Sequence, residues 1–279
     1  DVLIIGSPVK IPVRAEAAMA LSSNIPTICV DHGNESGSGD HPVWGFDEQS
    51  YCSHFVGYGS AWIKAVENGK YIKPLFSKPK YIKSNSTYIK ANYVSKKIDK
   101  LDNDLSNLKF AYIPTKLMGS KRIGPFLSIS DEEYIAWQKY LFKVFSNLDY
   151  KAHPKQKIDH QIGDVNIIHD NIENCVNKYD GFIVDTVVTT AFANIAATNK
   201  PIIYFNIGFG NLSSVALKPI NDRVIWVDVD INNPGDIVKR IEKKLSKPLI
   251  NNFTNQFCII DDNNSREKTV VDIVKRIVK

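Results

Sequence analysis

Polar side chains that could bind a phosphate or move a proton follow several short apolar runs of the sequence. Such runs are typical of buried parallel strands, and ligands of open parallel sheets bind at the carboxyl ends of the strands. The shared position predicts one polar crevice, which is a stronger argument than any single residue. The residues concerned are Asp31 with His32, Thr115, His153, Asp185 with Thr186, and Asn206 with Gly208.

The segment from Asp185 to Thr190, with the sequence DTVVTT, predicts a phosphate site. Thr189 and Thr190 open an Ala-rich helix expected over Thr189–Thr198. First-turn N–H groups of a helix carry a partial positive charge and hold anions well, and the two hydroxyls would add donors. The alternative is that a threonine only caps the helix. Both interpretations stay open.

His153 is a second candidate, because Pro154 follows it and fixes the backbone there. A histidine held at a strand end can donate to a phosphate oxygen or protonate a leaving phosphate. The alternative is an ordinary, half-exposed loop histidine. The loop that contains Lys121 and Arg122 follows the expected strand Phe110–Ile113 and could bind a pyrophosphate. Its alternative is a mobile basic loop.

The sequence Asp31-His32-Gly33 offers a general base for an acceptor hydroxyl. Gly33 permits a tight turn after the strand, which would present Asp31 or His32 across a cleft. The alternative is turn chemistry alone, since Asp and Gly are common turn formers. The residues do not decide between Asp31 and His32 as the base.

Alternating apolar runs and helical patterns must position these side chains, and they predict an α/β fold. Residues 1–76 are expected to form a partial Rossmann-like domain, and residues 77–107, rich in Lys and Asn, a linker or crossover. Residues 108–279 are expected to form a nearly complete open α/β domain. Because the sequence runs from Asp1 straight into the expected strand Val2–Gly6, we expect part of the first domain to be missing.

Four expected elements matter for the comparison with the structure. Apolar residues recur at helical spacing from Tyr134 to Leu148. They predict a helix that begins at the acidic residues Asp131 to Glu133. Val165–Ile168 is expected to be a strand. Ile237, Ile241 and Leu245 mark one amphipathic helix, and residues 270–277 mark the last.

Composition sets the limits on function. The 279 residues are 43% hydrophobic and 23% charged, which excludes a mainly disordered or fibrous protein. The net charge of +5 suits an anionic ligand but is too small to argue for nucleic acid. The four cysteines form no CxxC pair, so buried free thiols in a reducing cytoplasm are expected. No apolar run is long enough to span a membrane.

The order of these motifs resembles the GT-B fold transferases of bacterial surface polysaccharide biosynthesis. The shared features are the HP pair at His153, then a strand ending in Asp185 before the Thr pair, then the sequence NKPIIYF. They are similar to those of CDP-glycerol glycerophosphotransferases and of transferases that use CMP-Kdo or CMP-sialic acid. The resemblance covers most of residues 108–279 and only patches before them.

The resemblance implies two Rossmann-like domains in a GT-B-like arrangement, with an acceptor-side domain first and a nucleotide-donor domain second. It implies that His153, Thr189 and Thr190 contact the donor phosphate, and that His32 is a candidate base. The sequence departs from the glycerophosphotransferases in two places. DTVVTT stands where they have DYSS, and Asn34-Glu35 follows Gly33 where they have a Thr-x-x-Lys pattern. These departures favour a sugar donor over a polyol-phosphate donor.

We therefore expect an inverting, metal-independent glycosyltransferase that uses a CMP- or CDP-linked donor in capsule, O-antigen or related lipopolysaccharide biosynthesis. His32, Asp31 and His153 are its expected catalytic residues. The expected donor-binding residues are His153, Asp185, Thr186, Thr189, Thr190, Thr115, Arg122 and Lys121. Three alternatives stay open: a polyol-phosphate transferase, a sugar epimerase-like enzyme of the same fold, and a non-catalytic nucleotide- or glycan-binding module.

The expected partners are a nucleotide-sugar donor and a glycan or lipid-linked acceptor, with no nucleic acid. No cofactor or metal is expected, because Asp228-Val229-Asp230, which matches an Asp-x-Asp motif, reads as the end of a strand. A cytoplasmic location is expected. Peripheral contact with the inner face of the membrane, through the Lys-rich residues 73–100, is the open alternative.

Overall fold

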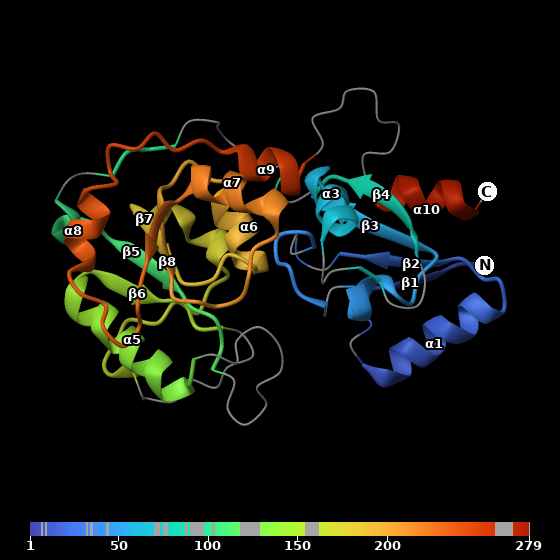
Figure 1. Cartoon of the computed structure of the whole chain (residues 1–279), viewed down its shortest axis with the longest axis horizontal. Coiled ribbons are helices and arrows are strands. Elements are labelled where there is room, and N and C mark those ends of the chain that lie inside the picture. Colours follow the sequence, from blue (N-terminus) through green and yellow to red (C-terminus); the bar gives the residue numbers. More distant parts are fainter. Residues whose placement is uncertain are drawn as a thin grey trace.

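The chain is an α/β protein built on two separate sheets, and every strand pair within each sheet is parallel (Figure 1). The α/β class and the parallel sheets confirm the sequence-based prediction and are compatible with Rossmann-like domains. The structure is a computed structural model. It describes residues 1–6, 8, 10–31, 33, 36–42, 45–69, 73–74, 78–86, 89, 98–101, 104–117, 129–153, 162–259 and 270–278.

The first sheet has four strands in the order β1-β2-β3-β4. Their bounds are β1 Leu3–Ile5, β2 Thr27–Val30, β3 His54–Tyr58 and β4 Lys80–Ser84. The connecting segments contain α1 Ile11–Ser22, the π-helix η1 Gly45–Gln49 and α3 Ala61–Asn68. Because all four strands run the same way, the segments that follow them leave the sheet at one edge.

Both faces of the first sheet are covered, as a parallel sheet requires. Phe55 on one face packs with Trp62 of α3, their ring centroids 5.2 Å apart. On the other face, Ile28, Val56 and Ile82 pack against the C-terminal helix α10 Val270–Val278. Figure 1 shows α10, in red, beside β4, and both chain ends lie at this sheet.

The second sheet has five strands in the order β6-β5-β7-β8-β9. Their bounds are β5 Phe110–Ile113, β6 Leu148–Tyr150, β7 Gly181–Val184, β8 Ile202–Asn206 and β9 Ile225–Asp228. The sequence of β7 and β8 is apolar on both faces, as expected for central strands covered on two sides. Alternate residues accordingly belong to two cores: Ile183 and Ile203 to one, Phe182 and Ile202 to the other.

Helices cover both faces of the second sheet. The α5 helix Asp131–Val144 and α8 Ile237–Glu242 contribute to one core, and α6 Thr190–Ala196, α7 Ser214–Arg223 and α9 Asn252–Phe257 to the other. Short 3-10 turns lie at η2 Leu105–Asn107, η4 Ile172–Asn174 and η5 Val176–Lys178. This helix–sheet–helix layering is that of a doubly wound α/β domain.

The start of α5 follows from its sequence. Ser130 accepts a hydrogen bond from the Glu133 amide at 3.1 Å, and the Glu133 carboxylate accepts one from the Ser130 amide at 2.6 Å. This capping box satisfies two N–H groups that a helix start otherwise leaves unpaired. The acidic start predicted for this helix is confirmed. The helix ends at Val144, whereas Leu148, expected on its apolar face, begins β6.

Several other elements differ from the expected ones. Lys80–Ser84, expected within the 77–107 linker, forms β4 and completes the first sheet. Val165–Ile168 is not a strand, because only Ile167 pairs there, with Tyr150. The last helix, expected in the second domain, packs on the first sheet. The helices α7 and α9 fall where no helix was expected.

The cysteines and the helix lengths agree with the composition. All four thiols are free and buried, as predicted. In the part of the chain that the structure describes, no helix combines the length and the apolar character needed to cross a bilayer.

Candidate functional site

The strand order of the second sheet creates a switch point between β5 and β7. Counted within this sheet, the order is 2-1-3-4-5, so the connections from β5 to β6 and from β7 to β8 leave in opposite directions. In doubly wound sheets a crevice opens at this point, outside the carboxyl ends of the two strands, and ligands bind there. The residues that follow β5, β6 and β7 therefore define the candidate site.

Thr115, Asp185 and Thr186 follow β5 and β7 at this switch point. All three are buried: Thr115 is 7% exposed, Thr186 3% and Asp185 0%. Asp185 Oδ2 accepts hydrogen bonds from the hydroxyls of Tyr134, at 2.8 Å, and Tyr112. The Asp185 carboxylate is therefore enclosed by protein and has no surface to offer a donor molecule.

Burial also changes the proton affinity of Asp185. Desolvation of the charged form raises its pKa to about 6, although the hydrogen bonds from Tyr112 and Tyr134 lower it. The same burial, together with the charge of Asp185, raises the pKa of Tyr112 and of Tyr134 well above the usual value for tyrosine. The three groups form one buried network between β5, β7 and α5.

The two threonines at the start of α6 have different roles. Thr189 is half-buried, and its Oγ1 accepts a hydrogen bond from the Phe192 amide at 3.1 Å, so it is the N-cap of the helix. Thr190 is exposed in the first turn. The helix has only 7 residues, so its dipole is a small part of any attraction for an anion. Capping thus accounts for Thr189, while the Thr190 side chain is accessible.

His153 follows β6, the strand next to β5. The amide of Lys151 donates to the Tyr112 carbonyl at 2.8 Å, which continues the β5–β6 pairing one residue beyond β6. His153 comes two residues later and is half-buried. The chain thus brings His153 to the same sheet edge as Thr115 and Asp185. Lys121 and Arg122, the predicted basic partners, lie outside the described residues.

Asp31 follows β2 in the first sheet and closes a turn. Its Oδ1 accepts a hydrogen bond from the Gly33 amide at 3.2 Å, and the residue is 3% exposed. Burial, with a contribution from the Asp31 charge, raises the pKa of Tyr58 in β3 and of Cys258, which follows α9. Asp31 therefore forms the turn that the sequence allowed. His32, the other candidate base, lies outside the described residues.

The segment that continues from this turn touches the second half of the chain. Ser213, the N-cap of α7, donates its hydroxyl to the Gly37 carbonyl at 2.6 Å and its amide to the Ser38 carbonyl at 3.0 Å. Gly39 forms an antiparallel bridge with Leu212. The loop after β2 thus lies directly against the loop that joins β8 to α7, at the carboxyl end of the second sheet.

Asn206 and Asp228, at the ends of β8 and β9, are engaged with each other. The Asn206 side-chain amide and the Trp226 indole N–H each donate to Asp228 Oδ1 at 2.8 Å. β9 ends at Asp228, as expected for the Asp228-Val229-Asp230 segment. Within the described residues, no group of three or more His, Cys, Asp or Glu side chains is placed to hold a metal ion.

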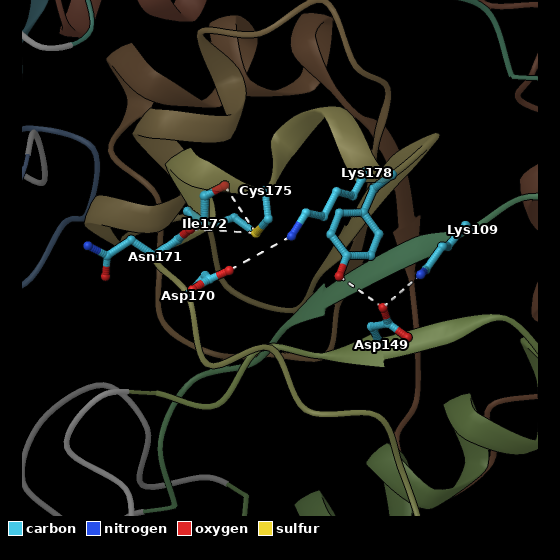
Figure 2. A network of polar contacts seen from close by, with 8 residues as sticks. Lys109, Asp149, Asp170, Asn171, Ile172, Cys175 and Lys178 are labelled. Carbon is cyan, nitrogen blue, oxygen red and sulfur yellow. Dashed lines mark hydrogen bonds and ion pairs between the residues drawn. The ribbon is translucent and has the colours of Figure 1, made fainter.

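A second polar network joins neighbouring strands of the second sheet near their amino-terminal ends (Figure 2). The Asp149 carboxylate on β6 accepts the Tyr179 hydroxyl at 2.9 Å and lies 3.2 Å from Lys109 Nζ. Lys109 and Tyr179 come just before β5 and β7, so this network joins the starts of the strands. The residues of the candidate site follow the other ends of these strands.

Tyr112 and Tyr134 are the site residues that the sequence did not reveal. Tyr134 was expected only as an apolar residue of the α5 face, and Tyr112 only as part of a strand. Both are fully buried aromatic residues whose hydroxyls need partners. The sequence contained a hint of this network, because a buried tyrosine hydroxyl can donate a hydrogen bond to an Asp at a strand end. Which tyrosines reach Asp185 is seen only in the tertiary structure.

Comparison of the sequence with models of known protein families finds no match, and comparison with curated proteins finds none.

Proposed function

We propose that the chain is a nucleotide-dependent transferase, specifically an inverting glycosyltransferase that uses a CMP- or CDP-activated sugar. The observation that carries the proposal is the switch point of the second sheet, where His153, Thr115 and Thr190 follow or flank neighbouring strand ends. A crevice at such a point, with hydroxyl and imidazole donors at its rim, suits a nucleotide phosphate. A GT-B-like arrangement of the two sheets is part of this proposal.

The proposed reaction follows from the chemistry of the donor. The acceptor hydroxyl attacks the anomeric carbon, and the bond from that carbon to the phosphate oxygen breaks, so the nucleotide leaves with the electron pair. His153 and the Thr190 hydroxyl hydrogen-bond the phosphate and stabilise the negative charge that develops on it. Lys121 or Arg122 assists, so protein donors carry the charge neutralisation.

A base on the first sheet would accept the proton of the acceptor hydroxyl. Contact between the loop after β2 and the start of α7 supports this assignment, because it keeps Asp31 near the second half of the chain. Asp31 is already part of a turn. We therefore place His32 ahead of Asp31 as the base. A glycan or lipid-linked acceptor in bacterial surface polysaccharide synthesis, at the cytoplasmic face of the membrane, completes the proposal.

Thermal unfolding in the presence of CMP, CDP, UDP or GDP tests the nucleotide site. A nucleotide at about 100 times its Kd stabilises the fold by about 2.7 kcal/mol, which raises Tm measurably. We expect a shift with the cytidine nucleotides that is reduced in His153→Ala. His54→Ala is the matched control, because His54 begins β3 in the other sheet. A shift with UDP or GDP alone would discard the cytidine assignment, and no shift with any of the four would overturn the proposal.

Turnover separates an enzyme from a binding module. The buried, turn-forming Asp31 is the observation that favours a module, since a base must reach the acceptor. With CMP- and CDP-sugars, we expect slow donor hydrolysis that is lost in His32→Ala while nucleotide binding is retained. Binding without hydrolysis or transfer would favour the module.

A further inference from the structure

The carboxyl group of Asp185 is closed off from solvent, and its two oxygens differ. Oδ2 accepts hydrogen bonds from the Tyr134 and Tyr112 hydroxyls. Oδ1 is buried, and no hydrogen-bond partner for it lies among the described residues. Native proteins satisfy most buried polar atoms, so an unsatisfied carboxylate oxygen at the switch point of the sheet calls for an explanation.

The Tyr134 hydroxyl connects Asp185 to the chain that leaves β5. It accepts the Thr115 amide at 3.0 Å and donates to Asp185 Oδ2 at 2.8 Å. A single side chain of α5 thus joins the segments that follow β5 and β7, the two strands that flank the switch point. Tyr134 therefore fixes the separation of these two segments at the switch point.

The charge of Asp185 acts on four tyrosines: Tyr112 on β5, Tyr134 on α5 and Tyr150 on β6, which share one core, and Tyr204 on β8, which belongs to the core on the other face of the sheet. Burial is the largest cause of the raised pKa of all four phenols, and the Asp185 charge is the second largest. Besides burial, the largest causes of the shift of the Asp185 pKa are the hydrogen bonds from the Tyr112 and Tyr134 hydroxyls, which lower it. These hydrogen bonds stabilise its negative charge.

This environment works against a second negative charge nearby. A phosphate that enters the crevice would repel the Asp185 carboxylate through a poorly screened, low-dielectric region. The neutral acid removes this repulsion. A proton on Oδ1 would leave Oδ2 free to accept from both tyrosines, so the network that holds Thr115 would survive protonation. Burial already raises the pKa of Asp185 to about 6, which is close to neutral pH.

We propose that Asp185 is a positioning residue, which holds the two strand ends through Tyr134 and takes up one proton from solvent when a nucleotide phosphate binds. This inference rests on the nucleotide site proposed above. It places Asp185 beneath the ligand and gives it no direct contact with the phosphate.

The first test compares CDP binding to the wild type and to Asp185→Asn by calorimetry, from about pH 7.5 to about pH 5.5. The Asn side chain keeps an oxygen that can accept from the tyrosines but carries no charge. At the higher pH we expect the wild type to bind CDP at least about threefold more weakly than the variant. At the lower pH the two affinities should converge. Titration of the CDP phosphate itself affects both proteins equally, so it cancels in the ratio of the wild-type affinity to the variant affinity.

The second test uses Tyr134→Phe, which keeps the ring and removes the linking hydroxyl. Because the Tyr134 hydrogen bond lowers the pKa of Asp185, its loss should move the inflection of the affinity profile to higher pH. CDP affinity should also fall, since Thr115 loses its anchor. Tyr140→Phe is the matched control on the same helix, where the hydroxyl donates to the Gly235 carbonyl at 2.6 Å. It should leave the profile unchanged.

Proton uptake in the wild type gives a readout that needs no variant. Calorimetry in two buffers of different ionisation enthalpy should show net proton uptake on CDP binding near pH 6, beyond that of the phosphate itself. CDP binding with no such uptake, or with equal pH profiles in wild type and Asp185→Asn, would overturn the inference and leave the proposed function standing. No CDP binding at any pH would overturn both.

Discussion

The two threonines at the start of α6 allow a role in the fold to be separated from the proposed role in ligand binding. Thr189 has its hydroxyl oxygen engaged by the Phe192 amide, so removal of that oxygen leaves an N–H group of the first turn unpaired. The Thr190 side chain is exposed in the first turn of the helix. The pair therefore offers an internal comparison between capping and phosphate binding.

Thr189→Ala should lower the free energy of unfolding by about 1 kcal/mol, the usual cost of a lost N-cap. Thr190→Ala should change it by less than about 0.5 kcal/mol, as exposed substitutions usually do, yet weaken nucleotide binding. Urea unfolding and nucleotide titration of both variants check this. A stability loss in Thr190→Ala, or unchanged nucleotide affinity, would remove Thr190 from the candidate site.

At the scale of elements, the strand starts of the second sheet are held by a network centred on Asp149. Burial acts to raise the pKa of this carboxyl, but hydrogen bonds from Asn166, Tyr179 and Lys109 outweigh it, and the net pKa lies below the usual value. A group with a depressed folded pKa stabilises the fold above its unfolded pKa. That contribution is lost as the pH falls through the folded value.

Asp149→Asn should therefore reduce the free energy of unfolding at neutral pH by about 1.5 kcal/mol, the scale of a hydrogen bond to a charged group. The difference from wild type should shrink as the pH falls below about 4, where the wild-type carboxyl also becomes neutral. Urea unfolding at several pH values measures it. Asp170→Asn is the control, because the Asp170–Lys178 pair at 3.8 Å is exposed (Figure 2). An equal loss in both variants would contradict the central role of Asp149.

The sequence predicted those elements whose composition indicates that they are buried. β7 and β8 are continuous apolar runs, and α5 has both an acidic start and periodic aromatic residues. β4 was missed because Lys80 and Lys83 face solvent at the edge of the sheet. Its sequence therefore lacks the continuous apolar run that indicates a buried strand. The α7 helix was missed because Pro219 and five polar residues interrupt its apolar spacing.

The candidate site could be located only in part. Its position at strand ends followed from the α/β pattern, and Thr189, Thr190 and His153 lie at the expected edge of the sheet. The burial of each side chain could not be predicted from the sequence. Asp185 was expected to touch the donor, but its burial depends on Tyr112 and Tyr134, which are distant in sequence and reach it only through the packing of α5.

At the scale of the whole molecule, the chain ends by returning to its first sheet. The α10 helix places Ile273, which is fully buried, against Ile28, Val56 and Ile82. Without α10 this face of a parallel sheet would be open to water. The last nine residues of the described chain therefore complete a core whose strands come from the first 84 residues.

Ile273→Ala should cost about 3 kcal/mol, the combined effect of lost burial and the cavity left behind. Val271→Ala, on the same helix at a position 59% exposed, is the matched control and should cost less than about 0.5 kcal/mol. Native-state hydrogen exchange locates the damage. Amides of β2 and β3 should lose protection in Ile273→Ala, while those of β7 and β8, which belong to other cores, keep more of theirs. Uniform loss of protection in both sheets would instead mean that the two halves unfold as one unit, joined by the contacts of Ser213 with Gly37 and Ser38.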